Sequence, residues 1–483
     1  MDISPTNINE AFLRRQMMDA EGLKSMKRIG ILTAGGDTPA LNATLHGTVA
    51  RANALKIEVY GLIKGYNSLQ NPHVPHVHLN PLFQAIPELD PTYGGTILGA
   101  SRDYVDAGDR DVIARIVERL ARLNIEGLIC VGGDGTLNAM QAVADYMPTV
   151  LAPKTIDNDL GLNYMAEPTE WAREGVDEKG KPRYHRTTLR KDMRLDDMVN
   201  YVTPGYATSV FVSAQGVQRI RTTAESHRRI AIIEVMGRQS GFLALGTAYG
   251  QPDMILVPEH PLEPERLVAR VLELYDIQKN VVIIVSEGIV DQSGKELGVL
   301  KQTRDPAGNI IYSGAAEAVK DILVDAIGDR FFLDRRRNES ANAAIFTRKV
   351  GHTQRGGRPI LFDRFYAAQL GGKAVDMLLE GWHNGIAILQ RADDTFKLDS
   401  IDANRLRDRW GEIHPRYMHA SFYDAERFLP SEKGIDYLQR IFTNAIGYDD
   451  VESIRAEIFD ASHLMQPYHS VNVDVHKRIR YLS

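Results

Sequence analysis

Short apolar runs alternate with longer segments of helical spacing through residues 27–390. The short runs have the length of buried strands, and the longer segments place apolar residues on one face of a helix. Predicted strands span residues 27–33, 57–62, 127–131, 150–152, 230–235, 254–257 and 281–285. Predicted helices span residues 43–55, 110–123, 137–146, 207–222, 263–274, 313–328 and 365–379. Strands that alternate with helices predict an α/β fold with parallel sheets that helices cover on both faces.

The same pattern divides the chain into five parts. Residues 1–26 are a polar N-terminal extension, and residues 27–160 form a first α/β domain. A charged insertion at 161–204 separates it from a second α/β domain at 205–390. The alternation then stops, and residues 391–483 carry helical fragments with scattered aromatic residues, which we expect to pack on the body as a helical C-terminal extension. At roughly 100–200 residues per domain, a chain of 483 residues agrees with this division.

Composition narrows the class of protein. The chain is 43% hydrophobic and 25% charged, which is ordinary for a globular protein, and its net charge of -6 argues against nucleic acid held by bulk charge. No apolar run reaches the ~18 residues that span a bilayer. The single cysteine, Cys130, cannot form an internal disulfide and lies in an apolar strand. We therefore expect a cytoplasmic protein with neither nucleic acid nor membrane as partner.

The stretch Pro-Lys-Thr-Ile-Asp-Asn-Asp at 153–159 follows a short apolar run that is typical of a strand end. The carboxylates of Asp157 and Asp159 point to the same side if the segment is extended. One can take a proton from an alcohol while the other holds a divalent metal, and Lys154 can neutralise phosphate charge. The alternative is an Asp/Asn-rich turn without a ligand.

Three glycine-rich loops accompany this stretch. Residues 34–42 and 132–136 each lie between a predicted strand and a predicted helix, an arrangement that aims backbone N–H groups at a phosphate. Residues 93–102 form a third loop, which ends in an arginine suited to bridging phosphate oxygens. Tight turns without a ligand are the alternative. If all these loops follow strands, they converge at the carboxyl ends of the sheet.

Together these residues suit phosphoryl transfer, in which a protein mainly positions reactants and neutralises charge. Asp134 is a candidate metal ligand, Asp157 a candidate proton acceptor, and arginines of the second domain are candidates to bind an anionic substrate. A basic cluster at 183–194 lies inside the charged insertion, and we interpret it as a solvated face.

Six motifs resemble those of the phosphofructokinase family, and they occur in the family's order across residues 27–390. They are Gly-Gly-Asp-Thr-Pro at 35–39, Gly-Gly-Thr-Ile-Leu-Gly-Ala-Ser-Arg at 94–102, Gly-Gly-Asp-Gly-Thr at 132–136, Pro-Lys-Thr-Ile-Asp-Asn-Asp at 153–159, Glu-Val-Met-Gly-Arg at 234–238 and Gly-His-Thr-Gln-Arg-Gly-Gly at 351–357. The resemblance implies two Rossmann-like three-layer αβα domains with mostly parallel sheets, the first for the phosphoryl donor and the second for the sugar phosphate. It also implies phosphorylation of the 1-hydroxyl of fructose 6-phosphate in glycolysis, with Mg2+ and with ATP or, in some members, pyrophosphate.

The resemblance implies roles for individual residues. Asp157 resembles the general base, Thr155 contacts the transferred phosphoryl group, Asp159 lies near the metal, and Asp134 holds Mg2+. Lys154, Gly36 and Arg102 neutralise or stabilise the phosphoryl group. The donor site implied comprises Gly35, Gly36, Arg102, Gly133, Asp134, Gly135 and Thr136. The sugar-phosphate site implied comprises Thr155, Asp157, Arg229, Met236, Gly237, Arg238, Glu287, His352 and Arg355.

The resemblance also implies a homo-oligomer, a dimer or a tetramer. In bacterial relatives, the arginine that matches Arg229 reaches the site from a neighbouring subunit, so sites are shared between subunits.

Two positions bear on the phosphoryl donor. Pyrophosphate-dependent members usually have Asp where this chain has Gly135 and Lys where it has Lys154, whereas common bacterial ATP enzymes have Gly at both. A carboxylate at 135 would crowd and repel the α-phosphate of a nucleotide, and glycine leaves that space open. Lys154 compensates phosphate charge with either donor. We therefore favour ATP, with pyrophosphate as the alternative.

Several positions depart from the family pattern. Phe346 stands where the family often has a phosphate-binding arginine, and Arg348 or the basic cluster at 183–194 are the candidate substitutes. If neither replaces that arginine, the substrate is expected to be a sugar phosphate other than fructose 6-phosphate, for example sedoheptulose 7-phosphate. His46 and Ala50 replace effector-site arginines of bacterial relatives, so we do not expect control by the usual bacterial effectors.

A third hypothesis is a non-catalytic sugar-phosphate sensor or regulatory subunit, which Phe346 and the long extensions favour. The intact set of Asp157, Asp159, Asp134 and Arg102 argues against it, since a sensor has no use for a base beside a metal site.

Overall fold

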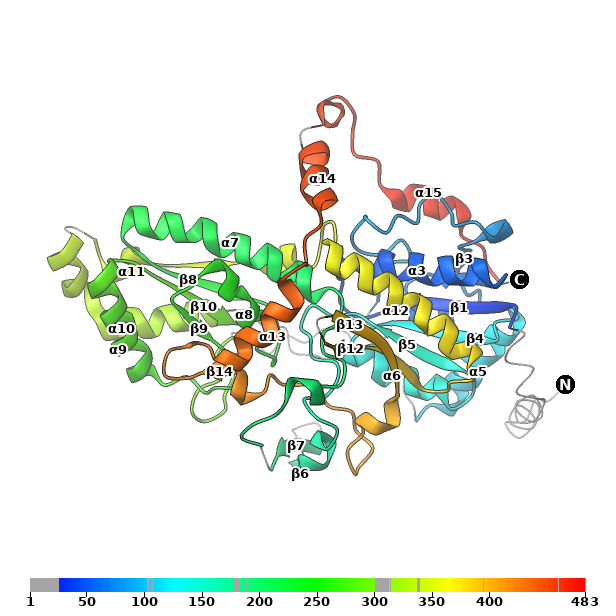
Figure 1. The fold of residues 1–483 in the computed structure, drawn as a ribbon, viewed down its shortest axis with the longest axis horizontal. Coiled ribbons are helices and arrows are strands. Elements are labelled where there is room, and N and C mark those ends of the chain that lie inside the picture. Colours follow the sequence, from blue (N-terminus) through cyan, green and yellow to red (C-terminus); the bar gives the residue numbers. More distant parts are fainter. Residues whose placement is uncertain are drawn as a thin grey trace.

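Two α/β lobes lie side by side, each built around its own sheet (Figure 1). In this computed structural model, the described residues are 26–101, 105, 108–176, 182–187, 190–299, 312, 314–336, 339–393, 395–458 and 460–482. Parallel strands dominate both sheets and helices cover their faces, which confirms the predicted fold class.

The larger lobe contains a seven-stranded sheet in the order β13-β12-β5-β4-β1-β2-β3. Its strands are β1 (Arg28–Thr33), β2 (Glu58–Leu62), β3 (His76–His78), β4 (Gly127–Gly132), β5 (Thr149–Pro153), β12 (Gly385–Ala392) and β13 (Thr395–Asp402). The five central strands are parallel, and the edge strands β3 and β13 run antiparallel to their neighbours. The central strands read as continuous apolar runs because both of their faces are buried.

Helices cover both faces of this sheet. One core cluster packs α3 (Leu41–Ala54) and α12 (Leu361–Leu379) against it, and a second packs α5 (Arg110–Arg122) and α6 (Asp134–Ala144) on the other face. The short helix α4 (Tyr66–Gln70) lies beside α5. Helices α3 and α12 approach closely at Gly47, where any Cβ would overlap the backbone of Ala368.

The smaller lobe has a four-stranded parallel sheet in the order β11-β8-β10-β9. Its strands are β8 (Ile230–Val235), β9 (Met254–Leu256), β10 (Val281–Ser286) and β11 (Ile345–Lys349). Its helices are α7 (Tyr206–His227), α8 (Phe242–Gly246), α9 (Pro264–Gln278), α10 (Ala315–Arg336) and α11 (Ala341–Ala344). The apolar residues of α7 and α8 cover one face of the sheet, and those of α9 and α10 cover the other.

The chain returns to the larger lobe at α12, inside the range 205–390 predicted for the second domain, which the sequence did not predict. The boundary expected at residue 390 falls inside β12, which pairs in parallel with β5 and in antiparallel with β13. Strand β13 therefore lies within the range expected to be helical. The apolar run in β12 is a local signal, but its partner β5 is more than 200 residues away, so no local pattern indicates the pairing.

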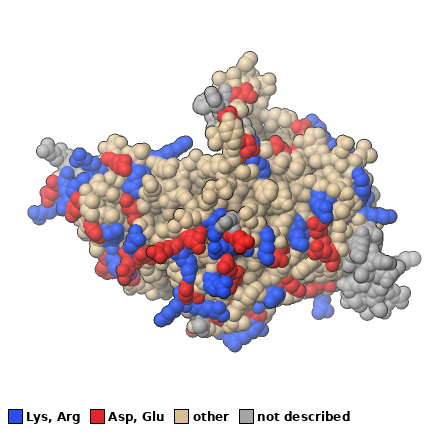
Figure 2. All heavy atoms as spheres, viewed as in Figure 1, with Lys and Arg blue, Asp and Glu red and all other residues tan. Residues whose placement is uncertain are grey.

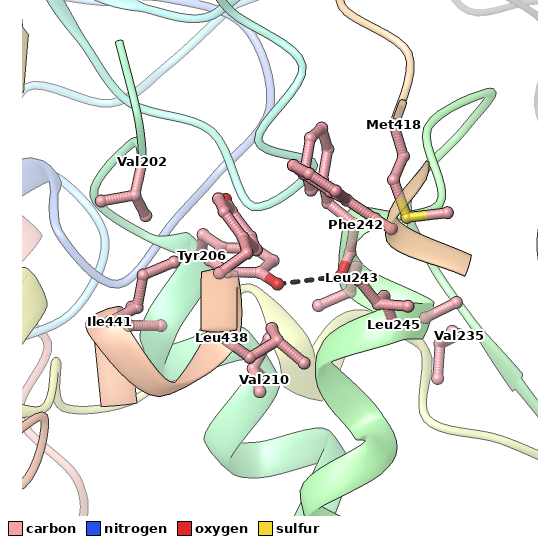
Figure 3. Packing of buried hydrophobic residues seen from close by; sticks show 14 of the residues in the cluster. Val202, Tyr206, Val210, Val235, Phe242, Leu243, Leu245, Met418, Leu438 and Ile441 are labelled. Carbon is pink, nitrogen blue, oxygen red and sulfur yellow. Dashed lines mark hydrogen bonds between the residues drawn. The ribbon is translucent and has the colours of Figure 1, made fainter. Parts of the chain in front are cut away.

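The rest of the C-terminal region packs into the smaller lobe before it leaves the body. Leu438 and Ile441 of α13 (Glu432–Phe442), together with Met418, contact the core beside Tyr206, whose hydroxyl donates to the carbonyl of Phe242 at 2.9 Å (Figure 3). A small hairpin, β14 (Tyr423–Asp424) and β15 (Leu429–Pro430), precedes α13. Helix α14 (Tyr448–Ile458) projects from the body, and α15 (Val471–Arg478) returns to β3 (Figure 1).

The charged insertion forms an antiparallel hairpin, β6 (Trp171–Val176) with β7 (Pro182–Arg186). Trp171 stacks on His414 of the C-terminal region, with ring centroids 3.8 Å apart. Within the basic cluster, Arg194 is largely exposed, as the interpretation of a solvated face expects. Arg186 differs, because its guanidinium is nearly buried between the carboxylates of Glu167 and Glu170.

The surface carries charges of both signs, and the helices that the structure describes lack long apolar runs, as the composition of the chain predicts. Figure 2 shows a band of Asp and Glu across the middle of one face, with Lys and Arg interleaved beside it and below it. None of the helices in the described ranges is long and apolar enough to cross a membrane. Cys130 is buried in β4, where burial raises the pKa of its thiol to about 12.

Candidate active site

The glycine loops and the 153–159 stretch meet at the carboxyl ends of β1, β4 and β5. They enclose a cavity of about 230 Å³, and two arginines from the smaller lobe complete its wall. The lining residues are Ala34, Gly35, Gly36, Asp37, Thr38, Tyr66, Ser101, Gly133, Asp134, Gly135, Thr136, Asn138, Lys154, Thr155, Ile156, Asp157, Arg238 and Arg355. The convergence expected from parallel topology is present for the loops at 34–42 and 132–136 and for the 153–159 stretch, whereas the loop at 93–102 does not directly follow a strand and reaches the cavity through Ser101.

The first glycine loop is held by the other loops. The N–H of Ala34 donates to the carbonyl of Val131 at 3.0 Å, and that of Gly35 donates to Ser101 at 2.9 Å. Gly35 has a φ of 81°, and an added Cβ would lie 3.4 Å from the hydroxyl of Thr136. Glycine is therefore favoured at this position by its backbone conformation, since a Cβ at 3.4 Å would make only an ordinary van der Waals contact.

Lys154 is buried beneath the same loop, and its ammonium donates to the carbonyl of Gly36. Burial lowers the pKa of this ammonium to about 7, although the carboxylates of Asp37 and Asp157 oppose the shift. The lysine thus places a titratable cation at the wall of the cavity.

The N-terminus of α6 faces the cavity through Gly133, Asp134, Gly135 and Thr136. Among the described residues, no side chain caps this end, so its N–H groups and the positive end of the helix dipole can bind an anion. At Gly135, an added Cβ would meet no heavy atom within 4 Å. The space that the sequence argument assigned to a nucleotide phosphate is therefore open.

Pro153 ends β5 and the chain then turns at 157–159, so the extended segment that would point both carboxylates to the same side is not present. Asn158 has a φ of 57°, in the left-handed region that asparagine tolerates. The N–H of Asp157 donates to the hydroxyl of Thr155 at 3.0 Å, which fixes the side chain of Thr155. Asp157 and Asp159 are both buried, with exposed fractions of 6% and 4%.

The carboxylates at this turn fit a divalent cation. Asp157 Oδ1 and Asp159 Oδ1 are buried without a hydrogen-bond partner among the described residues. Burial, together with the charges of Asp134 and Asp157, raises the pKa of Asp159 to about 8. Within the described ranges, no group of three or more His, Cys, Asp or Glu side chains is placed to hold a metal ion by itself. Mg2+ in phosphoryl-transfer sites is usually held by one or two carboxylates together with substrate phosphates.

The smaller lobe contributes an arginine directly opposite this turn. Arg238 follows β8, and its guanidinium lies 3.8 Å from Asp157 Oδ2 and 3.7 Å from Asp134 Oδ1. Burial lowers its pKa, but the carboxylates of Asp134, Asp157 and Asp159 outweigh burial and raise that pKa above its usual range. Arg238 therefore stays charged and lies beside the carboxylates of Asp134 and Asp157.

Other residues predicted for the sugar phosphate gather at the same ends of β8 and β10. The N–H of Arg238 donates to Glu287 Oε1 at 3.1 Å, and Arg355 Nε donates to the sulfur of Met236 at 3.2 Å. Burial raises the pKa of Glu287 to about 7, and the charge of Asp157 adds to the shift. Gly237 joins Met236 to Arg238, with a φ of 134°. His352 lies in the turn Gly351–Gln354 and does not line the cavity.

Among the predicted residues that the structure describes, those that do not line the cavity are Asp159, Arg229, Met236, Gly237, Glu287 and His352. Arg229 precedes β8 at the end of the strand opposite to Met236, and its guanidinium pairs with Glu339 at 2.8 Å. Within this chain it therefore points away from the site. Arg102 lies outside the described residues, as does most of the N-terminal extension.

Neither candidate substitute for the missing arginine lines the cavity. Phe346 packs against the core of the smaller lobe, and the guanidinium of Arg348 lies over its ring at 5.2 Å. The described residues of the basic cluster at 183–194 also lie outside the cavity wall.

Sequence reasoning missed several residues of the wall. Asp37 and Thr38 belong to the first motif and could have been chosen with its glycines. Burial raises the pKa of Asp37. Tyr66 and Asn138 carry no local signal, because their positions depend on how α4 and α6 pack. The hydroxyl of Tyr66 donates to the carbonyl of Thr136 at 3.2 Å and so supports the start of α6.

Glycine-loop N–H groups, a buried lysine and clustered carboxylates between two α/β lobes are typical of enzymes that transfer phosphoryl groups. A model of the family "Phosphofructokinase" matches residues 28–166 and 191–378. The chain therefore belongs to the phosphofructokinase family and is a phosphotransferase with an alcohol as acceptor.

Curated relatives with either phosphoryl donor are similar to this chain. The ATP-dependent 6-phosphofructokinase 2 of Streptomyces coelicolor is 33% identical over 371 residues, which cover 76% of this chain and 92% of the relative. The pyrophosphate–fructose 6-phosphate 1-phosphotransferase of the same organism is 29% identical over 371 residues, with coverages of 76% and 91%.

Solved structures support the fold. A pyrophosphate-dependent phosphofructokinase from Nitrosospira multiformis matches with a TM-score of 0.65 at 17% identity, over 88% of this chain and 93% of that one.

Proposed function

We propose that this protein is a 6-phosphofructokinase that transfers a phosphoryl group from ATP to the 1-hydroxyl of fructose 6-phosphate in glycolysis. The observation that carries the proposal is the buried carboxylate of Asp157 at the cavity between the lobes, which faces Arg238 and has one oxygen without a hydrogen-bond partner among the described residues. Its neighbours Thr155 and Lys154 border the same space.

The chemistry follows from this arrangement. Asp157 accepts the proton of the attacking hydroxyl, the new bond forms between that oxygen and the transferred phosphorus, and the bond to the leaving phosphate breaks. The N–H groups of Gly36 and of the α6 N-terminus, with the ammonium of Lys154, stabilise the phosphoryl oxygens. Asp134 and Asp159 would hold Mg2+, which neutralises phosphate charge when bound. Arg238 and Arg355 bind and orient the sugar phosphate.

The open space at Gly135 supports ATP as the donor, because a nucleotide needs room there for its α-phosphate. Lys154 supports the second candidate, a pyrophosphate-dependent phosphotransferase, because its buried cation suits a compact donor of high charge. Relatives named for each donor are similar to this chain.

We also propose a homo-oligomer in the cytoplasm. Arg229 supports sites shared between subunits, because it points away from the cavity of its own chain at a position where bacterial relatives supply an arginine to a neighbour. The single, buried cysteine supports a reducing compartment.

The test is a coupled assay on the purified full chain with Mg2+ and fructose 6-phosphate, with ATP in one reaction and pyrophosphate in the other. Turnover with ATP alone is the expected result. Turnover with pyrophosphate alone would overturn the assignment of the donor. If both are silent, parallel reactions with sedoheptulose 7-phosphate test whether Phe346 has changed the sugar phosphate, and turnover there would overturn the assignment of the acceptor.

A pH dependence of donor binding follows from Lys154. Because its pKa in the free enzyme is about 7, the ammonium is charged below pH 7 and loses its proton above it. We therefore expect the Kd of an imido analogue of ATP to rise between pH 6 and pH 8.5, by up to ~10-fold per pH unit above pH 7. Titration calorimetry measures it. In the Lys154→Met variant, any change of Kd with pH comes from titration of the analogue itself. An equal dependence of Kd on pH in both proteins would contradict the role of Lys154.

A further inference from the structure

The C-terminal region reaches the turn that carries Asp157 and Asp159. Arg416 has an exposed fraction of only 1%, and its backbone N–H donates to the carbonyl of Asp159 at 2.6 Å. Its guanidinium donates to the carbonyl of Asn158 through Nη2 at 2.7 Å and through Nε at 3.3 Å. The residue between the two carboxylates is thus held from behind by a buried cation.

The same guanidinium also holds the end of the charged insertion. Its Nη1 donates to the carbonyl of Asn200 at 2.6 Å and to that of Val199 at 3.3 Å. An added Cβ at Gly161, which has a φ of 127°, would lie 3.1 Å from this nitrogen and would overlap the carbonyl of Val199. Because glycine has no Cβ, residue 161 leaves room for the guanidinium of Arg416.

The geometry of this turn needs support. Asn158 is in the left-handed region, and Asp134, Asp157 and Asp159 bring three carboxylates to one place. Burying a guanidinium is costly unless its donors are satisfied, and here backbone carbonyls satisfy them. The face of Phe242 lies beneath the guanidinium, 5.0 Å from its central carbon.

We propose that Arg416 is a positioning residue that holds the 157–159 turn, so that the carboxylate of Asp157 meets the acceptor hydroxyl. The proposal rests on the proposed function. Arg416 lies beyond residue 378, where the match to the family model ends. The C-terminal region then takes part in phosphoryl transfer as well as in packing.

Steady-state kinetics of full-length Arg416→Ala and Arg416→Lys test the proposal. We expect kcat to fall ~10²-fold for alanine, since a misplacement of about 1 Å at a reacting group has this effect. Lysine keeps the charge but cannot reach both carbonyl groups, so we expect an intermediate kcat. The KM for fructose 6-phosphate should stay within ~3-fold of wild type, because Arg238 and Arg355 are retained.

Arg364→Met is the matched control. Arg364 is also a largely buried arginine that joins the body to the C-terminal region, through Asp449 and Asp450 of α14, but it does not touch the turn. We expect its kcat to stay within ~2-fold of wild type. An equal fall of kcat in Arg364→Met and Arg416→Lys would overturn the proposal, since any loosening of the C-terminal region would then suffice.

Hydrogen–deuterium exchange gives a readout that does not depend on turnover. In Arg416→Lys, we expect faster exchange of the amides at 155–163 and 199–203, with residues 28–33 and the Arg364→Met protein unchanged. If the wild type is inactive with every donor and sugar, the proposed function is rejected. Hydrogen–deuterium exchange would still test whether Arg416 holds the 157–159 turn. Unchanged exchange at 155–163, or kcat within ~3-fold of wild type in both Arg416 variants, would reject the role of Arg416.

Discussion

Asp157→Ser is expected to lower kcat by ~10² or more, because a positioned general base typically contributes ~10²–10⁴ to the rate. Serine is smaller and cannot accept the proton from the hydroxyl at neutral pH. The KM for the sugar phosphate should not rise, since Arg238 loses a carboxylate at 3.8 Å that competes for its charge. Coupled assays at saturating Mg2+ measure both constants.

Asp196→Ser is the matched control for this result. Asp196 is a largely exposed aspartate of the insertion, and its carboxylate lies 3.5 Å from Arg391, away from the cavity. The same chemical change there should leave kcat unchanged. A kcat for Asp157→Ser close to that of the control would remove Asp157 from the role of base.

Gly135→Asp is expected to lower kcat/KM with ATP by ~10²-fold, because two like charges about 4 Å apart repel by ~4 kcal/mol at an effective dielectric constant of ~20 and part of this is screened. An added Cβ meets no heavy atom within 4 Å at this position, so the variant should fold and the effect should come from charge and space. Pyrophosphate lacks the α-phosphate of a nucleotide, so turnover with it should persist or appear. The measurement is the ratio of the rate with ATP to the rate with pyrophosphate in one preparation of the protein.

Gly216→Asp is the control for the donor experiment. Gly216 lies in α7, where an added Cβ also meets nothing within 4 Å, but it is not part of the cavity wall. This variant introduces the same residue and charge away from the cavity, so the ratio of the rate with ATP to the rate with pyrophosphate should not change. An unchanged ratio in Gly135→Asp as well would mean that residue 135 does not select the donor.

Local pattern predicted the strands and the loops of the site well. The run at 230–235 forms a strand with those bounds, because β-branched residues buried on both faces leave a continuous apolar signal. The loops at 34–42 and 132–136 and the 153–159 stretch lie at strand ends, and parallel topology then brings them together. The loop at 93–102 does not directly follow a strand and reaches the cavity through Ser101. Asp134, Lys154, Thr155 and Asp157 could therefore be predicted to meet before any tertiary contact was known.

Residues whose role depends on a distant partner could not be predicted in this way. The return of β12 to β5 and the contact of Arg416 with Asn158 join segments more than 200 residues apart. A backbone carbonyl is present at every residue, so the sequence carries no sign that an arginine will bind two of them. Whether Arg186 is solvated or buried between Glu167 and Glu170 is likewise decided by the fold.

The sequence by itself determined the family, the order of the elements and the residues that can do the chemistry, because these depend on residue type and on spacing along the chain. Only the tertiary structure decided that the chain turns at 157–159, that Arg238 lies beside Asp134 and Asp157, and that Arg229 points away from the cavity. It also decided which cation supports the turn from behind. These are distances between segments that meet only when the two lobes and the C-terminal region pack together.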